Sequence, residues 1–152
     1  ILRQQPIASD LRNVTSALKI VTDLERIGDQ AADIAEIILN FEGEHAYRTV
    51  EHIPTMAKKA KMMVHEAIDA FIKKDLSTAQ MVIKMDDEID SLFQEVKQEV
   101  TEILKENSER IDYCIDFLMI AKYLERVGDH AVNICEWLEF NQTGTMNDHR
   151  LI

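Results

Sequence analysis

The chain has 152 residues, the length of one ordinary domain, and its composition is 46% hydrophobic, 30% charged and 6% aromatic. Such a chain can bury a core and is not disordered by composition. The chain has only 4 Gly and 2 Pro, a composition that argues against a turn-rich β sandwich or barrel. The formal net charge of −11 disfavours nucleic acid and anionic membranes as primary partners, and it favours cations and basic protein surfaces.

Cysteine usage and targeting signals narrow the class further. Cys114 and Cys135 have no CxxC spacing, which indicates neither a disulfide framework nor a zinc site and fits a reducing compartment. No apolar run approaches the ~18 residues that a membrane span needs, and no basic segment precedes a short apolar one. The sequence therefore predicts no membrane span and no secretory signal. Because the chain opens with Ile1 and not Met, we expect it to begin part-way into a longer protein.

The first predicted helix is long. Apolar residues recur at steps of three and four from Ile7 to about Asn40, and Gly43 is expected to end the helix. Glu25 continues one apolar seam of this helix and is therefore expected at the edge of the core. The seam consists of Leu11, Val14, Leu18, Val21, Gly28 and Ala32.

Three more helices follow. The second is predicted over 53–73. The third begins near Asp75 or Ser77, where Ser77 and the three residues after it resemble a capping box, and ends near residue 105. The fourth follows Asn107 and Ser108 and ends near residue 140. Five methionines and Trp137 lie at apolar positions and are expected to fill the core; the methionines are Met56, Met63, Met81, Met85 and Met119.

One twenty-residue segment occurs twice. Residues 17–36 align without a gap to residues 117–136, with ten identities at an offset of 100 residues, and both copies contain Leu-Glu-Arg-[Ile/Val]-Gly-Asp. A period near 100 residues indicates a duplicated domain and not a solenoid. Only the second copy is preceded by two further helices in this chain. We therefore expect the first copy to have lost its partner helices.

The predicted fold is all-α. Short connections near residues 75 and 107 make neighbouring helices antiparallel. We expect an antiparallel three-helix bundle plus one long helix left over from a preceding, duplicated three-helix bundle. The corresponding domains are 1–43 for the last helix of the first bundle, 44–140 for the second bundle and 141–152 for a polar tail. A lone helix of about 33 residues would expose an apolar stripe, so we expect a homodimer, a higher oligomer or exchanged helices.

Each copy of the repeat carries a row of acidic side chains. On a helical wheel, four acidic residues of the first copy fall within a sector about 80° wide: Glu25, Asp29, Asp33 and Glu36. The same sector of the second copy holds Glu125, Asp129, Asn133 and Glu136. Like charges at this spacing destabilise a helix by a few tenths of a kcal/mol per pair, so we expect a positive charge to compensate them.

The third helix adds a second acidic pair. Asp86 and Asp90 are four residues apart, and two facing helices of this kind offer four carboxylates from opposite walls. Mg²⁺, Mn²⁺ and iron suit such an oxygen-rich setting. Gly28 and Gly128 each cost about 1 kcal/mol inside a helix, which indicates a close approach of a helix or a ligand. The alternative is that the acidic rows are solvated faces of a purely structural interaction module.

An enzymatic alternative is a carboxylate-bridged di-metal oxidase. Such sites need a Glu-x-x-His motif on two helices. Three residues after Glu25 and Glu125, this sequence has Gly28 and Gly128 in place of histidine. His130 points about 100° away from the row and is expected at the surface or boundary. The sequence also lacks a Gly-rich phosphate loop and a nucleophile elbow. We therefore do not expect an enzyme.

The repeated segment resembles the PhoU family of phosphate-transport regulators. The resemblance rests on the two Glu-Arg-x-Gly-Asp segments, on residues 5–12 (Gln-Pro-Ile-Ala-Ser-Asp-Leu-Arg) and on residues 86–90 (Asp-Asp-Glu-Ile-Asp), and it extends over about 4–140. It implies tandem three-helix bundles in a cytoplasmic, non-enzymatic protein that restrains phosphate uptake and the phosphate-starvation response. The implied partners are the ATPase subunit of the phosphate ABC transporter and a phosphate-sensing, membrane-bound histidine kinase.

The resemblance also implies metal ligands. Family members can carry iron or zinc clusters on Glu/Asp-x-x-x-Asp motifs, which implies iron or zinc here, with magnesium or manganese possible from the oxygen ligands alone. By position, the motifs of a complete site are Glu125 with Asp129 and Asp86 with Asp90. Half of a second site is formed by Glu25 and Asp29, with Asp33 on the same face.

Overall fold

The computed structural model describes residues 4–41 and 50–145. Over these ranges the chain forms four long helices with one short 3-10 turn before the last. They are α1 (Gln4–Leu39), α2 (His52–Lys73), α3 (Leu76–Glu106), the turn η2 (Ser108–Arg110) and α4 (Ile111–Thr143). The all-α prediction is confirmed, since the described ranges contain no strand.

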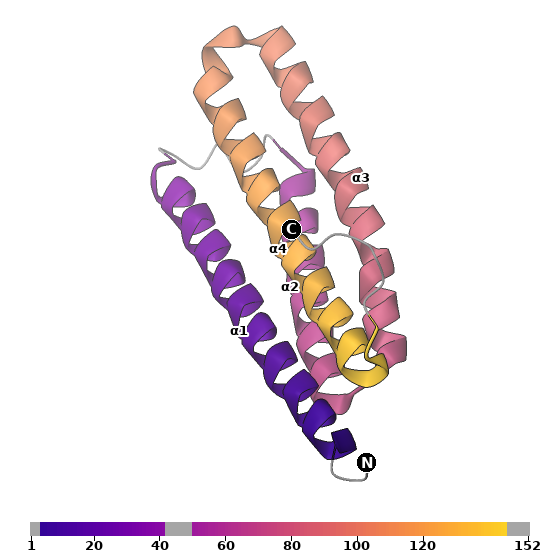
Figure 1. The fold of residues 1–152 in the computed structure, drawn as a ribbon. Coiled ribbons are helices and arrows are strands. Elements are labelled where there is room, and N and C mark those ends of the chain that lie inside the picture. Colours follow the sequence, from indigo (N-terminus) through magenta and orange to yellow (C-terminus); the bar gives the residue numbers. More distant parts are fainter. Residues whose placement is uncertain (1–3, 42–49, 146–152) are drawn as a thin grey trace.

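Helices α2, α3 and α4 pack on one another as a three-helix bundle, and α1 packs along α4 (Figure 1). Contacts between α1 and α4 show that the two helices are antiparallel. Ser16 near the start of α1 donates a hydrogen bond to the carbonyl of Trp137 near the end of α4 (3.5 Å), and Asn141 Nδ2 donates to Asn13 Oδ1 (2.7 Å). No helix in the described part of the chain is long and apolar enough to cross a membrane.

The core of the bundle follows helical periodicity. Helix α2 buries Met56, Ala60, Met63, Ala67 and Ala70. The expectation for the methionines was right for Met56, Met63 and Met85 and wrong for Met81 and Met119, which are 50% and 40% exposed. Each exposed methionine lies on the helix beside the buried stripe and not within it.

Helix α1 packs through a different stripe from the one expected. Ser16, Ile20 and Asp23 are buried against α4, whereas the expected seam is exposed, with values from 57% to 65% for Leu11, Val14, Leu18 and Val21. The helix has two apolar stripes, and in this chain α4 covers only one of them. Glu25 is accordingly exposed and does not lie at the edge of a core.

Two helix ends differ from the expected ones. The cap of α3 is Asp75 and not Ser77, because the Asp75 carboxylate accepts hydrogen bonds from the Thr78 backbone N–H (3.1 Å) and hydroxyl (2.7 Å). Helix α4 continues beyond residue 140 to Thr143, where Gly144 ends it in the left-handed conformation, with φ 72°. The polar tail therefore begins later than expected. Gly43 and residues 146–152 lie outside the described residues.

The start of α2 is held by a side chain from α3. The Glu99 carboxylate accepts hydrogen bonds from the backbone N–H groups of Glu51 (2.6 Å) and His52 (3.3 Å), and it also pairs with the His52 ring. The hydrogen bond with Glu99 raises the pKa of His52 above its usual value. Glu99 thus satisfies N–H groups at a helix start that lacks a local side-chain cap.

We predict that Glu99→Ala lowers the melting temperature by about 3 °C, because a lost cap costs about 1 kcal/mol in a domain of this size. The contribution of His52 to the stability of the fold depends on pH in a defined direction. A raised folded-state pKa stabilises the fold at low pH, and this contribution is lost as pH rises through that pKa. The difference between wild type and Glu99→Ala should therefore be larger at pH 6 than at pH 9 by calorimetry. Glu102→Ala, at an exposed position further along α3 where the side chain accepts a hydrogen bond from Gln98 (3.2 Å), is the control and should change little.

Candidate functional site

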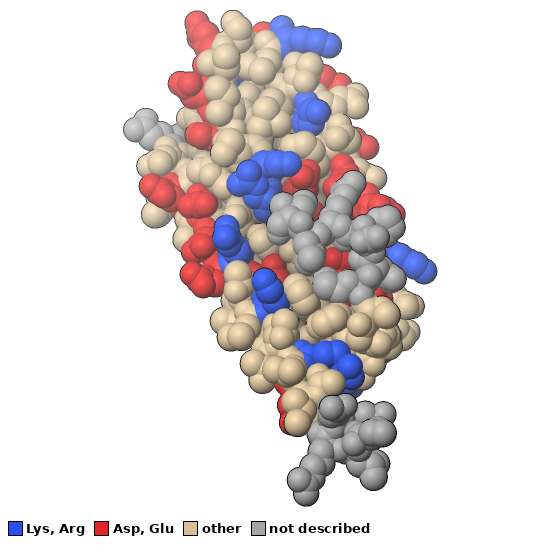
Figure 2. Space-filling view, viewed as in Figure 1, with Lys and Arg blue, Asp and Glu red and all other residues tan. Residues whose placement is uncertain are grey.

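A cleft of about 930 Å³ lies between α1, α3 and α4. Asp86 and Asp90 line it from α3, and Glu125 and Asp129 line it from α4. These are the four side chains predicted to form the complete site, and the fold brings them to one cleft. Figure 2 shows acidic and basic side chains intermixed over the face formed by α1 and α4.

Gly128 faces α3 at this cleft. A Cβ atom at Gly128 would lie 3.5 Å from Asp86 Oδ1 and 3.7 Å from the Ile89 side chain. These are ordinary van der Waals distances, so α3 packs against Gly128 without requiring a glycine there. At Gly28 an added Cβ would meet no atom within 4 Å, so the expected close approach is absent. The same motif therefore has a packed environment in its second copy and an open one in its first.

Asp86 is held in an unfavourable place for a charge. Its Oδ1 atom is buried and has no hydrogen-bond partner among the described residues. Burial, together with the charges of Asp129 and Asp90, raises the pKa of Asp86 to about 6. Burial and the neighbouring Glu125 also raise the pKa of Asp129. Desolvation and like charge are the two effects that a bound cation would relieve.

Glu136 extends the acidic wall along α4. It shares the helical sector of Glu125 and Asp129 but was not predicted as a ligand. Burial, followed by the charges of Glu139 and Asp23, raises its pKa to about 7. The cleft therefore contains more carboxylate than the predicted ligand motifs supply.

Positive and polar groups balance part of this charge. Lys122 Nζ is 2.6 Å from Glu125 Oε1. Asp23 of α1 pairs with His130 Nδ1 (2.9 Å) and accepts a hydrogen bond from Asn133 Nδ2 (3.2 Å), both on α4. His130 is half-buried, as expected of a boundary residue. The pair with Asp23 was not predicted, although Asp23 continues the periodic stripe of Ser16 and Ile20 that would have indicated it.

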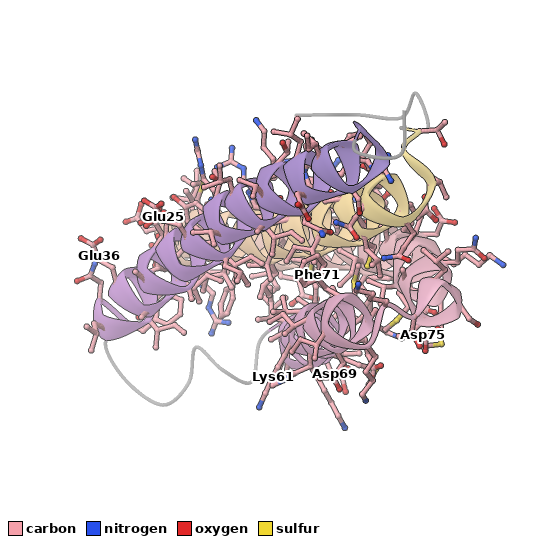
Figure 3. All side chains as sticks on the ribbon, turned by 60° about the horizontal axis from the view of Figure 1, so that its bottom comes forward. Glu25, Glu36, Lys61, Asp69, Phe71 and Asp75 are labelled. Carbon is pink, nitrogen blue, oxygen red and sulfur yellow. The ribbon has the colours of Figure 1, made fainter. Side chains whose placement is uncertain are left out.

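The acidic row of α1 does not join this cleft. Glu25 and Asp29 are exposed and Asp33 is half-buried, and none of the three lines the cleft. Figure 3 shows Glu25 and Glu36 projecting from the outer side of α1, away from α2 and α3. The row is therefore separate from the cleft. The fold places Asp23, Arg26 and Gln30 of α1 at the cleft instead.

The cleft meets only part of the requirements of a metal site. Its carboxylate oxygens are the donors that hard cations prefer, and the buried Asp86 Oδ1 lacks a partner. Within 4–41 and 50–145, however, no three Asp, Glu, His or Cys side chains converge as a ready ligand set. A metal ion would therefore bind with some rearrangement of side chains that already lie on the two walls.

The fold and the cleft together define a helical-bundle protein with a carboxylate-rich cleft between α1, α3 and α4. The sequence matches the PhoU domain over residues 1–38 and 53–138, and the chain belongs to the PhoU family. Both copies of the repeated segment lie within the matched ranges.

Relatives and solved structures agree with this family. The chain is 42% identical over 149 residues to a phosphate-specific transport system accessory protein PhoU homolog of Clostridium acetobutylicum, which covers 97% of this chain and 68% of that protein. It is 38% identical to the homolog of Pseudomonas aeruginosa, over 95% of this chain and 60% of that one. The chain thus spans about two thirds of the length of these relatives.

The fold matches two crystal structures. One is the phosphate transport system regulatory protein PhoU from Streptococcus pneumoniae, with a TM-score of 0.81 and 32% identity over 93% of this chain and 67% of that one. The other is PhoU from Pseudomonas aeruginosa, with a TM-score of 0.78 and 36% identity over 93% of this chain and 68% of that one.

We predict that Asp86→Asn stabilises the metal-free chain at pH 8. The carboxyl has a folded-state pKa raised to about 6, so its ionised form is destabilising above that pH, and the penalty fades as pH falls toward 4. We expect the variant to melt about 3 °C higher at pH 8, a value that allows for solvent screening of a half-buried group, to keep about half of this advantage at pH 5 and to lose most of it by pH 4.

The control for this experiment is Asp112→Asn, an exposed position in the first turn of α4. Titration of His52 affects all three proteins alike and cancels in the comparison. An Asp86→Asn variant that melts lower than wild type at pH 8 would show that the carboxylate is stabilising without a metal, contrary to the arrangement described.

Proposed function

We propose that this protein is a cytoplasmic accessory regulator that restrains phosphate uptake and phosphate-starvation signalling. The observation that carries the proposal is the PhoU match across both copies of the repeat, with relatives named as accessory proteins of a phosphate transport system. The proposed partners are the ATPase subunit of the phosphate ABC transporter and a phosphate-sensing histidine kinase. A net charge of −11 suits basic surfaces on such partners.

This regulatory role can be tested in a bacterium that lacks its own PhoU protein. Expression of this protein should restore repression of a phosphate-starvation reporter, such as alkaline phosphatase, in phosphate-rich medium. Pull-down of the transporter ATPase and of the kinase then tests the two contacts separately. Unchanged reporter activity, with the protein present in normal amounts, would contradict the role.

We further propose that the cleft binds a metal ion. Asp86 and Asp90 from α3 and Glu125 and Asp129 from α4 would hold it, and the partnerless Asp86 Oδ1 supports this assignment. Iron or zinc is proposed from the family, and magnesium or manganese from the oxygen donors. The ion would neutralise charge across the two helices. It could regulate partner binding only by binding the docked and free states with different affinities.

We predict that the purified protein carries metal and that Asp129→Asn reduces the content at least tenfold, because one ligand and one charge are lost. Plasma mass spectrometry measures the content, and Asp112→Asn is the matched control on the same helix. The competing function is an interaction module without metal, which is favoured by the lack of three convergent ligands in the described residues. It predicts no metal in any variant and normal repression by Asp129→Asn.

We also propose that α1 corresponds to the last helix of one bundle, that α2–α4 form a second, and that a further copy of the chain covers the exposed face of α1. The duplicated motif supports the division into two bundles. The association with a further copy rests on a stripe of exposed apolar side chains along one face of α1: Ile7, Leu11, Val14, Leu18, Val21 and Leu24. Exposed apolar stripes of this length mark association surfaces.

We predict that the 152-residue chain is a dimer or larger at micromolar concentration by light scattering. Leu18→Glu, in the middle of the stripe, should shift it to the monomer because a charge would be buried at the interface. Met81→Glu, an exposed apolar residue on α3, is the control and should leave the mass unchanged. A monomeric wild type would contradict the proposal.

A further inference from the structure

Lys122 lies at the acidic wall formed by α3 and α4. Its Nζ atom is 2.6 Å from Glu125 Oε1, one turn further along α4, and 5.6 Å from the centre of the Phe93 ring on α3. The Glu125 side chain is 16% exposed, whereas that of Lys122 is 45% exposed. The ammonium group therefore reaches from the solvent side onto a nearly buried carboxylate of the cleft.

The Phe93 ring helps to fix this position. The negative face of an aromatic ring attracts a cation, so the ring and the Glu125 carboxylate hold the ammonium from two directions. Lys97 lies over the same ring at 6.0 Å, but it comes from α3 and is not among the residues that line the cleft. One of the two lysines on this ring thus touches the candidate ligands and the other does not.

Lys122 already performs part of the task assigned to a metal ion. Glu125 shares the cleft with Asp86, Asp90 and Asp129, so these carboxylates repel one another. Burial and the charges of Glu125 and Asp90 raise the pKa of Asp129, and the Lys122 charge opposes this rise. The lysine therefore compensates like charge at two neighbouring positions of α4.

We propose that the Lys122 ammonium group acts as a counter-ion in the cleft. It pairs with Glu125 in the metal-free chain, and an incoming metal ion must displace it from this carboxylate. This inference rests on the proposed metal site and assigns to Lys122 the control of its affinity and ion preference. The ammonium group beside Glu125 Oε1 competes with an incoming metal ion for the negative charge of this carboxylate and repels the ion.

The displacement also discriminates between ions. A monovalent ion brings no more charge than the ammonium it replaces, and it has no covalent tether to hold it at the cleft. A divalent ion interacts with carboxylates on both α3 and α4 with twice the charge. Lys122 therefore excludes monovalent ions and sets the affinity that a divalent ion must exceed, as a competing interaction does in other specific sites.

The experiment measures Mn²⁺ binding by titration calorimetry on the purified full chain. Lys122→Met removes the charge and keeps an unbranched apolar side chain over Phe93. Lys97→Met is the matched control, because it removes a charge from the same ring without touching Glu125. We expect Lys122→Met to bind Mn²⁺ about fivefold more tightly than wild type and Lys97→Met to stay within about twofold. Lys122→Gln serves as a second variant.

The direction of the change separates this role from a structural one. If Lys122 only held Glu125 in place for the metal, its removal would weaken binding. A second readout is thermal unfolding without metal. Lys122→Met should melt lower than Lys97→Met, because its acidic wall lacks a counter-charge, and saturating Mn²⁺ should close that gap.

The possible results distinguish this inference from the metal site itself. If wild type binds Mn²⁺ and both Lys122 variants bind it equally or more weakly, the inference is overturned and the metal site stands. If only the Lys122 variants bind, the inference holds and the lysine closes the site in the wild type. If none of the proteins binds Mn²⁺, the metal site fails and the role of Lys122 fails with it.

Discussion

The structure depends on the packing of three helices around α4. Helices α1, α2 and α3 all contact it, so α4 buries residues around most of its circumference, from Cys114 to Leu138. A helix packed in this way has little surface left for charged side chains. Three of its six carboxylates, Glu125, Asp129 and Glu136, lie on the side where α1 and α3 leave a cleft. The acidic cleft is therefore a consequence of helix packing and not of a separate loop or insertion.

Confinement of like charge has an energetic cost that differs between the two sides of the cleft. At the α3 side, Asp86 keeps a buried oxygen without a partner, and its charged form is disfavoured. At the α1 side, Asp23 Oδ1 contacts both His130 and Asn133 and joins the two helices through a buried polar contact. Unsatisfied groups in one part of a site and satisfied ones in another are typical of a binding cleft on a structural support.

The two copies of the repeat show how environment changes the role of identical residues. Gly128 lies against Asp86, and Glu125 is nearly buried beside Lys122. Gly28 faces open space, and Glu25 is exposed. The first copy has α4 on one side only, whereas the second is surrounded. The same Glu-Arg-x-Gly-Asp motif therefore lines one wall of a cleft in α4 and belongs to an exposed acidic row in α1.

The sequence by itself determined the helices, through apolar periodicity, and their antiparallel order, through the short connections between them. The pairing of Asp86 and Asp90 with Glu125 and Asp129 was implied by the resemblance to the PhoU family. Tertiary structure decided which of the two apolar stripes of α1 is buried, since both have the same period and only the neighbouring helix distinguishes them. It also decided that Asp23 meets His130 and that Lys122 reaches Glu125 beside Phe93. Such contacts depend on the register between helices, which periodicity within one helix does not specify.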